Sequence, residues 1–237
     1  FHHTTAKPAG DRVLRRIATA ILVFSLAFMP AHEGLAKASK KAAPAENKKY
    51  ASIIIDAATG EVLSESNSNK VLHPASLTKV MTLMLLFDAL ENGSVRLNDK
   101  ILISKHAAAQ QPSKLGLPAG ASIRVEDAIL SVVTKSANDM ATAIGEHLAG
   151  SESRFAVRMT RRAHDIGMLR TNFVNASGLH HPSQVSTARD MATLARYILI
   201  RYPNYYRYFG TKQFTYRGKT MTNHNRLMQS YEGMDGF

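Results

Sequence analysis

The segment from Ser76 to Glu91 is apolar on all sides, and it constrains the fold more than any other part of the chain. Pro74 precedes it and Gly93 follows it, which is typical of the two ends of a helix. A helix without a polar face is buried all round. We therefore expect residues 76–91 to form the central helix of the domain. Its apolar residues are Val80, Met81, Leu83, Met84, Leu85, Leu86, Phe87, Ala89 and Leu90.

Shorter patterns predict the elements around this helix. Residues 51–56 and 61–65 are rich in β-branched and apolar residues on either side of the turn at residues 57–60, which predicts a hairpin. Helical spacing and capping residues predict four more helices and a second hairpin. These are residues 125–134, residues 139–149, a helix capped by Ser151 with Phe155, Met159 and Ala163 on one side, a helix opened by Thr187-x-x-Asp190 and ended before Pro203, and strands at 213–216 and 220–222.

Residues 1–38 have the layout of a secretory signal peptide. A positive stretch with Arg12, Arg15 and Arg16 precedes the 13-residue apolar run 17–29, and residues 36–38 read Ala-Lys-Ala. The run is shorter than the ~20 residues that cross a bilayer, so we expect export, with cleavage after residue 36 or 38, rather than a membrane anchor. Residues 39–49 then form a polar linker, residues 50–237 form the folded domain, and the mature protein lies in the periplasm or cell envelope.

Composition excludes several kinds of site. The chain has no cysteine, so disulfides, a thiol nucleophile and Cys-ligated zinc are excluded. A net charge of +12 suits an anionic partner such as an envelope polymer. The basic residues are scattered, so we expect no nucleic-acid binding. His180 and His181 lack the paired spacing of metal ligands, so we expect loop histidines and no metal.

Ser76-Leu77-Thr78-Lys79 places a serine and a lysine one turn apart on the same face of a helix. Serine is a weak nucleophile until a neighbouring base takes its proton. A lysine in an apolar setting near a helix N-terminus loses its charged form, and the neutral amine can accept that proton. The alternative is a capping serine beside a solvated lysine. The S-x-x-K pattern alone favours that alternative, because the pattern is common by chance.

Ser136-Ala137-Asn138 lies at the corner between the helices predicted at 125–134 and 139–149. A hydroxyl at this corner could relay a proton to a departing amine, and the carboxamide could bind an amide of a substrate. The alternative is an N-cap pair for the second helix. Capping and catalysis are compatible, so the alternative does not exclude the catalytic role.

These motifs and their surroundings resemble the D-alanyl-D-alanine carboxypeptidases of the low-molecular-mass penicillin-binding protein type, serine peptidases with the motifs S-x-x-K, S-x-N and K-T-G. The resemblance runs from about Ala51 to Phe237. It implies the α+β fold of the β-lactamases and DD-peptidases, an antiparallel sheet flanked by helices with a mainly helical lobe. The matching segments are 73–82, 136–139, Gly167-Met168, Thr171-Asn172-Phe173, Asn175-x-x-Gly178-Leu179, 186–190 and Asn223-x-Asn225-Arg226-Leu227.

The resemblance also implies a role for each motif residue. Ser76 attacks the carbonyl of the penultimate D-Ala of a peptidoglycan stem peptide, and the terminal D-Ala leaves. Lys79 accepts the proton and Ser136 passes it to the leaving nitrogen. Asn138 holds the acyl side, and the N–H of Ser76 forms part of the oxyanion hole. Water releases the shortened peptide, β-lactams act as covalent inhibitors, and no cofactor is needed.

The sequence departs from the family pattern at two places. Ala137 stands where these enzymes often have Gly, and no K-T-G follows Asp235-Gly236 within the 237 residues. Lys219-Thr220-Met221 is no substitute, because it precedes the match at 223–227. In the family, K-T-G is followed by further strands and sometimes by a C-terminal membrane-binding helix. We therefore expect a partial catalytic domain that lacks the C-terminal strands, has little activity, and exposes Ile53, Ile54 and Ile55 on a bare hairpin edge.

Three other functions stay open from the sequence. A class A β-lactamase needs a glutamate to position the deacylating water. The glutamates after Asn138 are Glu146, Glu152 and Glu232, and none stands in the expected E-x-x-x-N setting. A DD-endopeptidase acting on cross-links is a closer variant, which the sequence does not separate. A catalytically incomplete remnant that binds penicillin or peptidoglycan is the alternative from another class.

Overall fold

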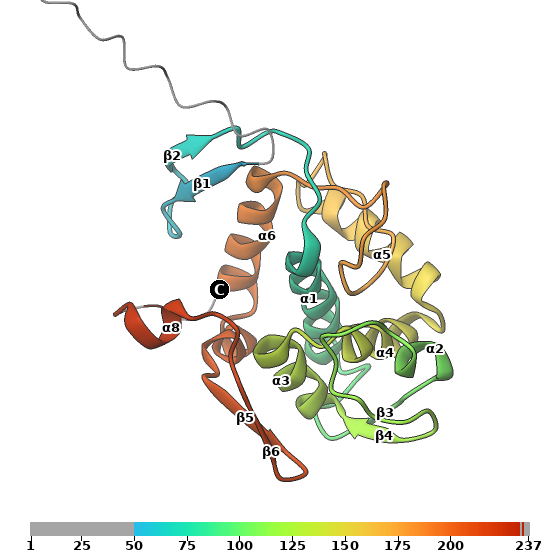
Figure 1. Cartoon of the computed structure of the whole chain (residues 1–237). Coiled ribbons are helices and arrows are strands. Elements are labelled where there is room, and N and C mark those ends of the chain that lie inside the picture. The colour runs from blue at the N-terminus through green and yellow to red at the C-terminus, as the bar shows by residue number, and fades with distance from the viewer. Residues whose placement is uncertain (1–49, 233, 235–237) are drawn as a thin grey trace, which may run out of the picture. The chain divides into compact units, whose positions relative to one another are not determined.

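The computed structural model of the chain describes residues 50–232 and 234 (Figure 1). The signal peptide and linker predicted at residues 1–38 and 39–49 lie outside the described residues. Within the described part, none of the helices combines the length and the apolar character that crossing a membrane requires.

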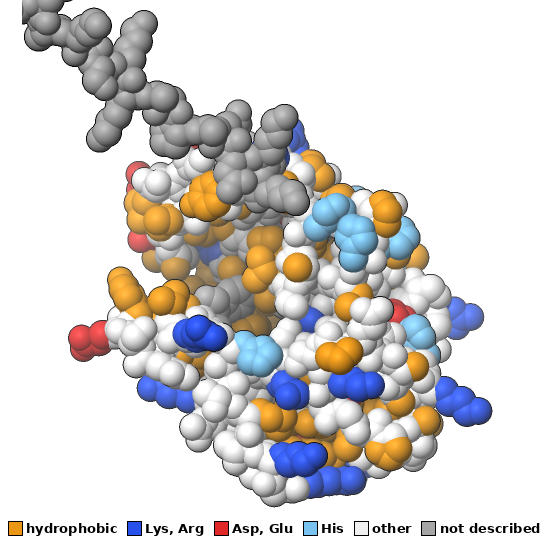
Figure 2. Space-filling model, in the orientation of Figure 1, with side chains coloured by type: hydrophobic (Ala, Val, Ile, Leu, Met, Phe, Trp, Pro, Cys, Tyr) orange, Lys and Arg blue, Asp and Glu red, His pale blue; other side chains and the backbone are white. Residues whose placement is uncertain are grey.

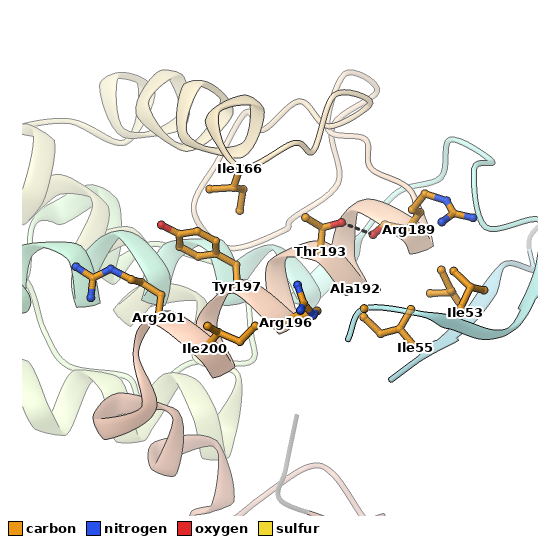
Figure 3. Close-up of a pocket in the computed structure, with 12 residues that line it drawn as sticks. Ile53, Ile55, Ile166, Arg189, Ala192, Thr193, Arg196, Tyr197, Ile200 and Arg201 are labelled. Atoms are coloured by element: carbon orange, nitrogen blue, oxygen red, sulfur yellow. Dashed lines mark hydrogen bonds between the residues drawn. The ribbon is translucent and has the colours of Figure 1, made fainter. Parts of the chain in front are cut away.

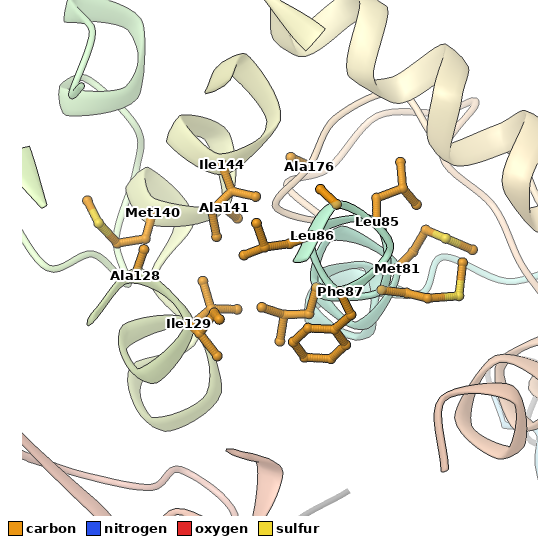
Figure 4. Close-up of a cluster of buried hydrophobic side chains, with 14 of the residues drawn as sticks. Met81, Leu85, Leu86, Phe87, Ala128, Ile129, Met140, Ala141, Ile144 and Ala176 are labelled. Carbon is orange, nitrogen blue, oxygen red and sulfur yellow. The ribbon is translucent and has the colours of Figure 1, made fainter. Parts of the chain in front are cut away.

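Helix α1 (Thr78–Glu91) is the centre of the described fold. It packs against α4 (Asn138–Ala149), α5 (Glu152–Asp165) and α6 (Ala188–Arg201), which lie around it in Figure 1. Of its 14 residues, 11 are buried, which confirms the prediction of an enclosed helix. Figure 4 shows how this core is built, with Leu86 of α1 facing Ala141 and Ile144 of α4.

The other predicted helices are confirmed with small shifts at their ends. Helix α3 (Val125–Lys135) is followed by α4, and α5 begins after Ser151, whose Oγ accepts a hydrogen bond from the N–H of Arg154. Helix α6 ends before Pro203, which opens the short helix α7 (Pro203–Tyr206). A 3₁₀ turn at Arg207–Gly210 and helix α8 (Leu227–Ser230) complete the C-terminal part.

The capping box predicted for α6 forms only in part. Oγ1 of Thr187 accepts from the N–H of Asp190 at 3.0 Å, as a capping residue should. The Asp190 carboxylate does not turn back to Thr187. It accepts instead from the N–H of Arg170 and the hydroxyl of Thr171, so it ties the start of α6 to the preceding loop.

Within residues 50–232 and 234, strands occur as three separate antiparallel pairs. Two of the pairs, β1–β2 and β5–β6, confirm the predicted hairpins, whereas β3–β4 and the short helix α2 (Lys105–Ala108) carry too few residues for a clear sequence pattern. The strands are β1 (Ser52–Ile55), β2 (Val62–Ser66), β3 (Lys100–Leu102), β4 (Ser122–Arg124), β5 (Gln213–Tyr216) and β6 (Lys219–Thr222).

The β1–β2 hairpin lies on α6 and is covered on one face. Ile53 and Ile55 point toward α6, in a pocket of about 450 Å³ that Ile166 and Ile200 also line (Figure 3). Ile54 points the other way and is 59% exposed, since successive side chains of a strand alternate. The expectation that all three isoleucines are bare is therefore wrong for Ile53 and Ile55. All five residues of β2 are exposed.

Asp88 places a carboxylate on the helix that the sequence pattern describes as apolar. Nε of Arg162 on α5 donates to Oδ2 of Asp88 at 3.0 Å, and the hydroxyl of Tyr202 after α6 donates to Oδ1. Nη2 of Arg162 also donates to the hydroxyl of Tyr197 at 2.9 Å. Burial and the hydrogen bond to Asp88 raise the pKa of Tyr202 above its ordinary value. This network joins α1, α5 and α6 near the C-terminal end of α1.

We predict that Asp88→Ala lowers the free energy of unfolding by about 1–3 kcal/mol, because Arg162 and Tyr202 lose their shared acceptor. Urea unfolding of the purified protein measures the change. Asp165→Ala removes an exposed carboxylate from α5 and is the control, with an expected change within about 0.5 kcal/mol. Equal effects of the two substitutions would contradict the role of the network.

Candidate active site

Ser76 lies in a 3₁₀ turn, Ala75–Leu77, that leads directly into α1. The α-helix therefore begins two residues later than predicted. The carbonyl of Pro74 accepts from the N–H of Leu77, and Ala75 has a left-handed backbone with φ of 48°. The turn leaves Ser76 exposed at the end of a buried helix, so its hydroxyl is open to a substrate.

Lys79 lies one turn beyond Ser76 and is only 3% exposed. Its Nζ lies 3.3 Å from Oγ of Ser76 and donates to the carbonyl of Ser177 at 2.5 Å. Burial lowers the pKa of Lys79 from 10.5 to about 8. The alternative of a solvated lysine is therefore wrong, and the two side chains have the geometry of a nucleophile and its proton acceptor.

A loop at residues 173–179 packs against this pair and covers Lys79. The carbonyl of Ala176 accepts from Oγ1 of Thr82 at 2.7 Å, next to the carbonyl of Ser177 that accepts from Lys79. Gly178 packs on the turn that carries Ser76. Its φ is +85°, and a Cβ there would lie 1.9 Å from the carbonyl oxygen of Ala75. Only glycine fits at position 178, for both backbone and steric reasons.

Two amide side chains hold the loop in place. Oδ1 of Asn175 accepts from the N–H of Gly178 at 2.7 Å and from Nε2 of Gln184 at 3.1 Å. Oε1 of the buried Gln184 accepts from the N–H groups of Val174 and Asn175, both at 2.9 Å. In the sequence, Asn175 and Gly178 stand only within a segment that matches the family, and no pattern marks Gln184. The available signal was the N-x-x-G spacing, because an Asn side chain often closes such a turn.

Ser136 and Asn138 occupy the corner between α3 and α4. Ser136 has a left-handed backbone with φ of 54°, immediately after α3 ends. Asn138 is the first residue of α4; its N–H donates to the carbonyl of Ser113 at 2.7 Å and its Nδ2 to the carbonyl of Gln111 at 2.9 Å. The N-cap interpretation is wrong, because the N-cap residue is Ala137 and no side chain caps α4.

The four motif residues are therefore brought together in two pairs. Ser76 and Lys79 contact each other directly. Ser136 and Asn138 lie at the start of α4, a helix that packs against α1. In residues 50–232 and 234, no hydrogen bond joins one pair to the other.

The histidines lie on the surface near the loop that encloses Lys79. His180 and His181 are exposed loop residues, as predicted. The ring of His180 meets the ring of His73 edge-on, with 5.2 Å between their centroids, and Figure 2 shows a group of histidine side chains on this face. Across the described residues, no three His, Cys, Asp or Glu side chains are placed to hold a metal ion.

Comparison with known proteins identifies relatives of the whole described region. A family model described as D-alanyl-D-alanine carboxypeptidase, peptidase family S11, matches residues 37–237. The D-alanyl-D-alanine carboxypeptidase DacF of Bacillus subtilis is 32% identical over 229 residues, which cover 94% of this chain and 59% of that protein. The chain thus spans less than two thirds of the length of this relative.

Solved structures share the fold. The D-alanyl-D-alanine carboxypeptidase DacD from Francisella tularensis has a TM-score of 0.75 and 27% identity, over 79% of this chain and 58% of that chain. Penicillin-binding protein D2 of Listeria monocytogenes, in its ampicillin-bound form, has a TM-score of 0.68 and 30% identity, over 80% and 78% of the two chains. These likenesses confirm the predicted α+β fold. Since the family model also matches residues 37–237, the chain belongs to the D-alanyl-D-alanine carboxypeptidase family of serine peptidases.

Proposed function

We propose that the protein is a serine-type D-Ala-D-Ala carboxypeptidase that removes the terminal D-alanine from peptidoglycan stem pentapeptides. The observation that carries the proposal is the buried amine of Lys79, 3.3 Å from the hydroxyl of Ser76, with its pKa lowered to about 8. An exposed hydroxyl beside a base of this pKa is suited to acyl transfer near neutral pH. The family supports the choice of substrate.

The reaction begins when the neutral amine of Lys79 accepts the proton of the Ser76 hydroxyl. Oγ of Ser76 attacks the carbonyl of the penultimate D-Ala, and the N–H of Ser76 donates to the developing oxyanion. The bond to the terminal D-Ala breaks, and its nitrogen leaves with a proton delivered through Ser136. Asn138 holds the acyl side through its amide. Water then hydrolyses the ester and restores Ser76.

The carbonyl of Ser177 holds Lys79 in place during this cycle. It accepts a hydrogen bond from Nζ before the reaction. Once Lys79 has taken the proton, the same bond carries a full charge and becomes stronger. The loop at residues 173–179 therefore stabilises the ammonium at the moment when the attack creates it.

We also propose that β-lactams acylate Ser76, because they present an acyl carbonyl to the same hydroxyl. The ampicillin-bound relative from Listeria monocytogenes supports this choice of inhibitor.

We further propose that residues 1–38 direct export and that the mature chain acts in the cell envelope. Protein from the envelope fraction should then begin at Lys37 or Ser39, and recovery of the uncleaved chain from the cytosol would contradict export.

We predict that a fluorescent penicillin labels Ser76 in a version of the protein that extends through the K-T-G motif, and that Ser76→Ala abolishes the label. Lys79→Ala should slow labelling by about 100-fold or more, because the hydroxyl loses the base bonded to it. In the release of D-Ala from a pentapeptide, each single variant should be nearly inactive and the double variant little worse than either, since the two side chains act as a unit. Peptide mapping and D-Ala release from a pentapeptide measure these effects.

Two results would contradict these assignments. If Lys79→Ala kept most of the rate, Lys79 would not be the proton acceptor. If the unaltered protein took no label, the alternative of a non-covalent binding protein would be favoured over the enzyme.

The rate of acylation should depend on pH through Lys79. The neutral amine is the reactive form, so the rate should rise with pH and level off above about 8. Below that pKa the neutral fraction falls about tenfold for each pH unit. The measurement is the second-order rate constant of penicillin labelling from about pH 6 to about pH 10. A flat profile, or a midpoint near the ordinary lysine value, would show that the burial of Lys79 does not set the reactivity.

Gly178→Ala should reduce acylation by about 100-fold, because the added Cβ must displace the backbone that carries Ser76. Gly167→Ala is the matched control. Gly167 also has a positive φ, +93°, but nothing lies within 4 Å of the added Cβ. It should cost about 1 kcal/mol of stability through backbone strain and leave labelling per folded molecule unchanged. Equal losses of labelling in both variants would contradict the steric argument.

A further inference from the structure

Glu152, the first residue of α5, carries a carboxylate that contacts three other parts of the chain. Its Oε1 accepts from the N–H of Ala176 at 3.0 Å and from Oγ1 of Thr142 on α4 at 3.1 Å. Its Oε2 lies 2.7 Å from Nε2 of His106 on α2. The Glu152 side chain is 12% exposed and that of His106 is 58% exposed. A carboxylate this far from water is stable only where hydrogen bonds replace its hydration.

The N–H that Glu152 binds belongs to the loop that holds Lys79. Three backbone groups in a row have fixed partners. The N–H of Ala176 donates to Glu152, the carbonyl of Ala176 accepts from Thr82, and the carbonyl of Ser177 accepts from Lys79. Because peptide groups are planar, the first two contacts fix the peptide planes on both sides of Ala176 and with them the position of the Ser177 Cα atom, from which the third carbonyl extends. Rotation of the Ala176 peptide would carry the Ser177 carbonyl away from Lys79.

Neither water nor another side chain can easily replace the Glu152 carboxylate as the acceptor for the N–H of Ala176. Ala176 is fully buried, so water does not reach its N–H in this arrangement. A Cβ added at Gly145 on α4 would lie 3.4 Å from the Cβ of Ala176 and 2.7 Å from the ring of Phe155 on α5. The loop therefore passes in close contact with α4 and α5. Without Glu152, the buried N–H would have no acceptor, which is unfavourable unless the loop moves.

We propose that Glu152 is a positioning residue for acyl transfer: it binds the N–H of Ala176, holds the Ser177 carbonyl on Lys79 and keeps water from that side of the amine. The inference rests on the proposed function, because Lys79 is taken as the proton acceptor. Glu152 acts through the loop and does not touch the substrate. Its two oxygens are bonded to Ala176, Thr142 and His106, so the role differs from that of a glutamate that positions a hydrolytic water.

The first test is the pH profile of penicillin labelling. In Glu152→Ala the loop loosens and water reaches Lys79. Water then replaces the Ser177 carbonyl as acceptor for the ammonium, and the relief of desolvation favours that charged form. The midpoint should then move from about 8 toward 10.5. A shift of about one unit lowers the labelling rate near neutral pH about tenfold.

Two matched variants separate the hydrogen bond from the charge. Glu152→Gln keeps a carbonyl oxygen for the N–H of Ala176 and should keep the midpoint of the unaltered protein. His106→Ala removes only the imidazole that contacts Oε2 of Glu152 and should keep that midpoint as well. If Glu152→Gln shifted the midpoint as far as Glu152→Ala does, the positioning hydrogen bond would not be the cause, and the proposal would be wrong.

A second route covers the case in which Glu152→Ala does not fold. Thr82→Val removes the hydroxyl that binds the Ala176 carbonyl, at nearly constant volume, and should shift the midpoint in the same direction. Hydrogen–deuterium exchange of a peptide covering residues 173–179 then reports on the loop without any reaction. Exchange should be faster in Glu152→Ala and Thr82→Val, and unchanged in Glu152→Gln and His106→Ala.

The two readouts also separate this inference from the proposed function. Absence of label in the unaltered protein would overturn the function, while exchange would still decide whether Glu152 holds the loop. Unchanged midpoint and unchanged exchange in Glu152→Ala, or in Thr82→Val where the first variant does not fold, would overturn the positioning role.

Discussion

The burial of a lysine on an enclosed helix is the constraint on which the site depends. Helix α1 is covered by α4, α5 and α6, so a side chain on its first turn leaves water when the core forms. For Lys79 this disfavours the ammonium, and its amine is left with the Ser76 hydroxyl and the Ser177 carbonyl as its hydrogen-bond partners. The packing that stabilises the domain is thus also the source of the neutral amine that the proposed reaction needs.

The sequence predicts this arrangement wherever the cause is local. The run of apolar residues at 76–91 predicts an enclosed helix, and the spacing of Ser76 and Lys79 places their side chains together. Where an unusual backbone conformation determines the local structure, residue types alone predict the wrong structure. Ala75 and Ser136 adopt left-handed conformations that no pattern for alanine or serine predicts, which moved the start of α1 and made the N-cap interpretation of Ser136-Ala137-Asn138 wrong.

The rest of the site comes from contacts between distant residues. The carbonyl that holds Lys79 lies 98 residues further along the chain, and a backbone carbonyl leaves no signature in a sequence. In the sequence, Asp88 only interrupts an apolar helix. Its hydrogen bonds with Arg162 and Tyr202 are visible only in the structure. Glu152 reads as one of several glutamates, and its bond to a buried N–H is visible only in three dimensions.

The absence of a side chain at Gly178 limits how the protein can change under antibiotic selection. Every replacement adds a Cβ that collides with the carbonyl of Ala75 and displaces the serine that follows it. With the proposed function, a replacement at residue 178 would therefore disturb Ser76 for substrate and β-lactam alike.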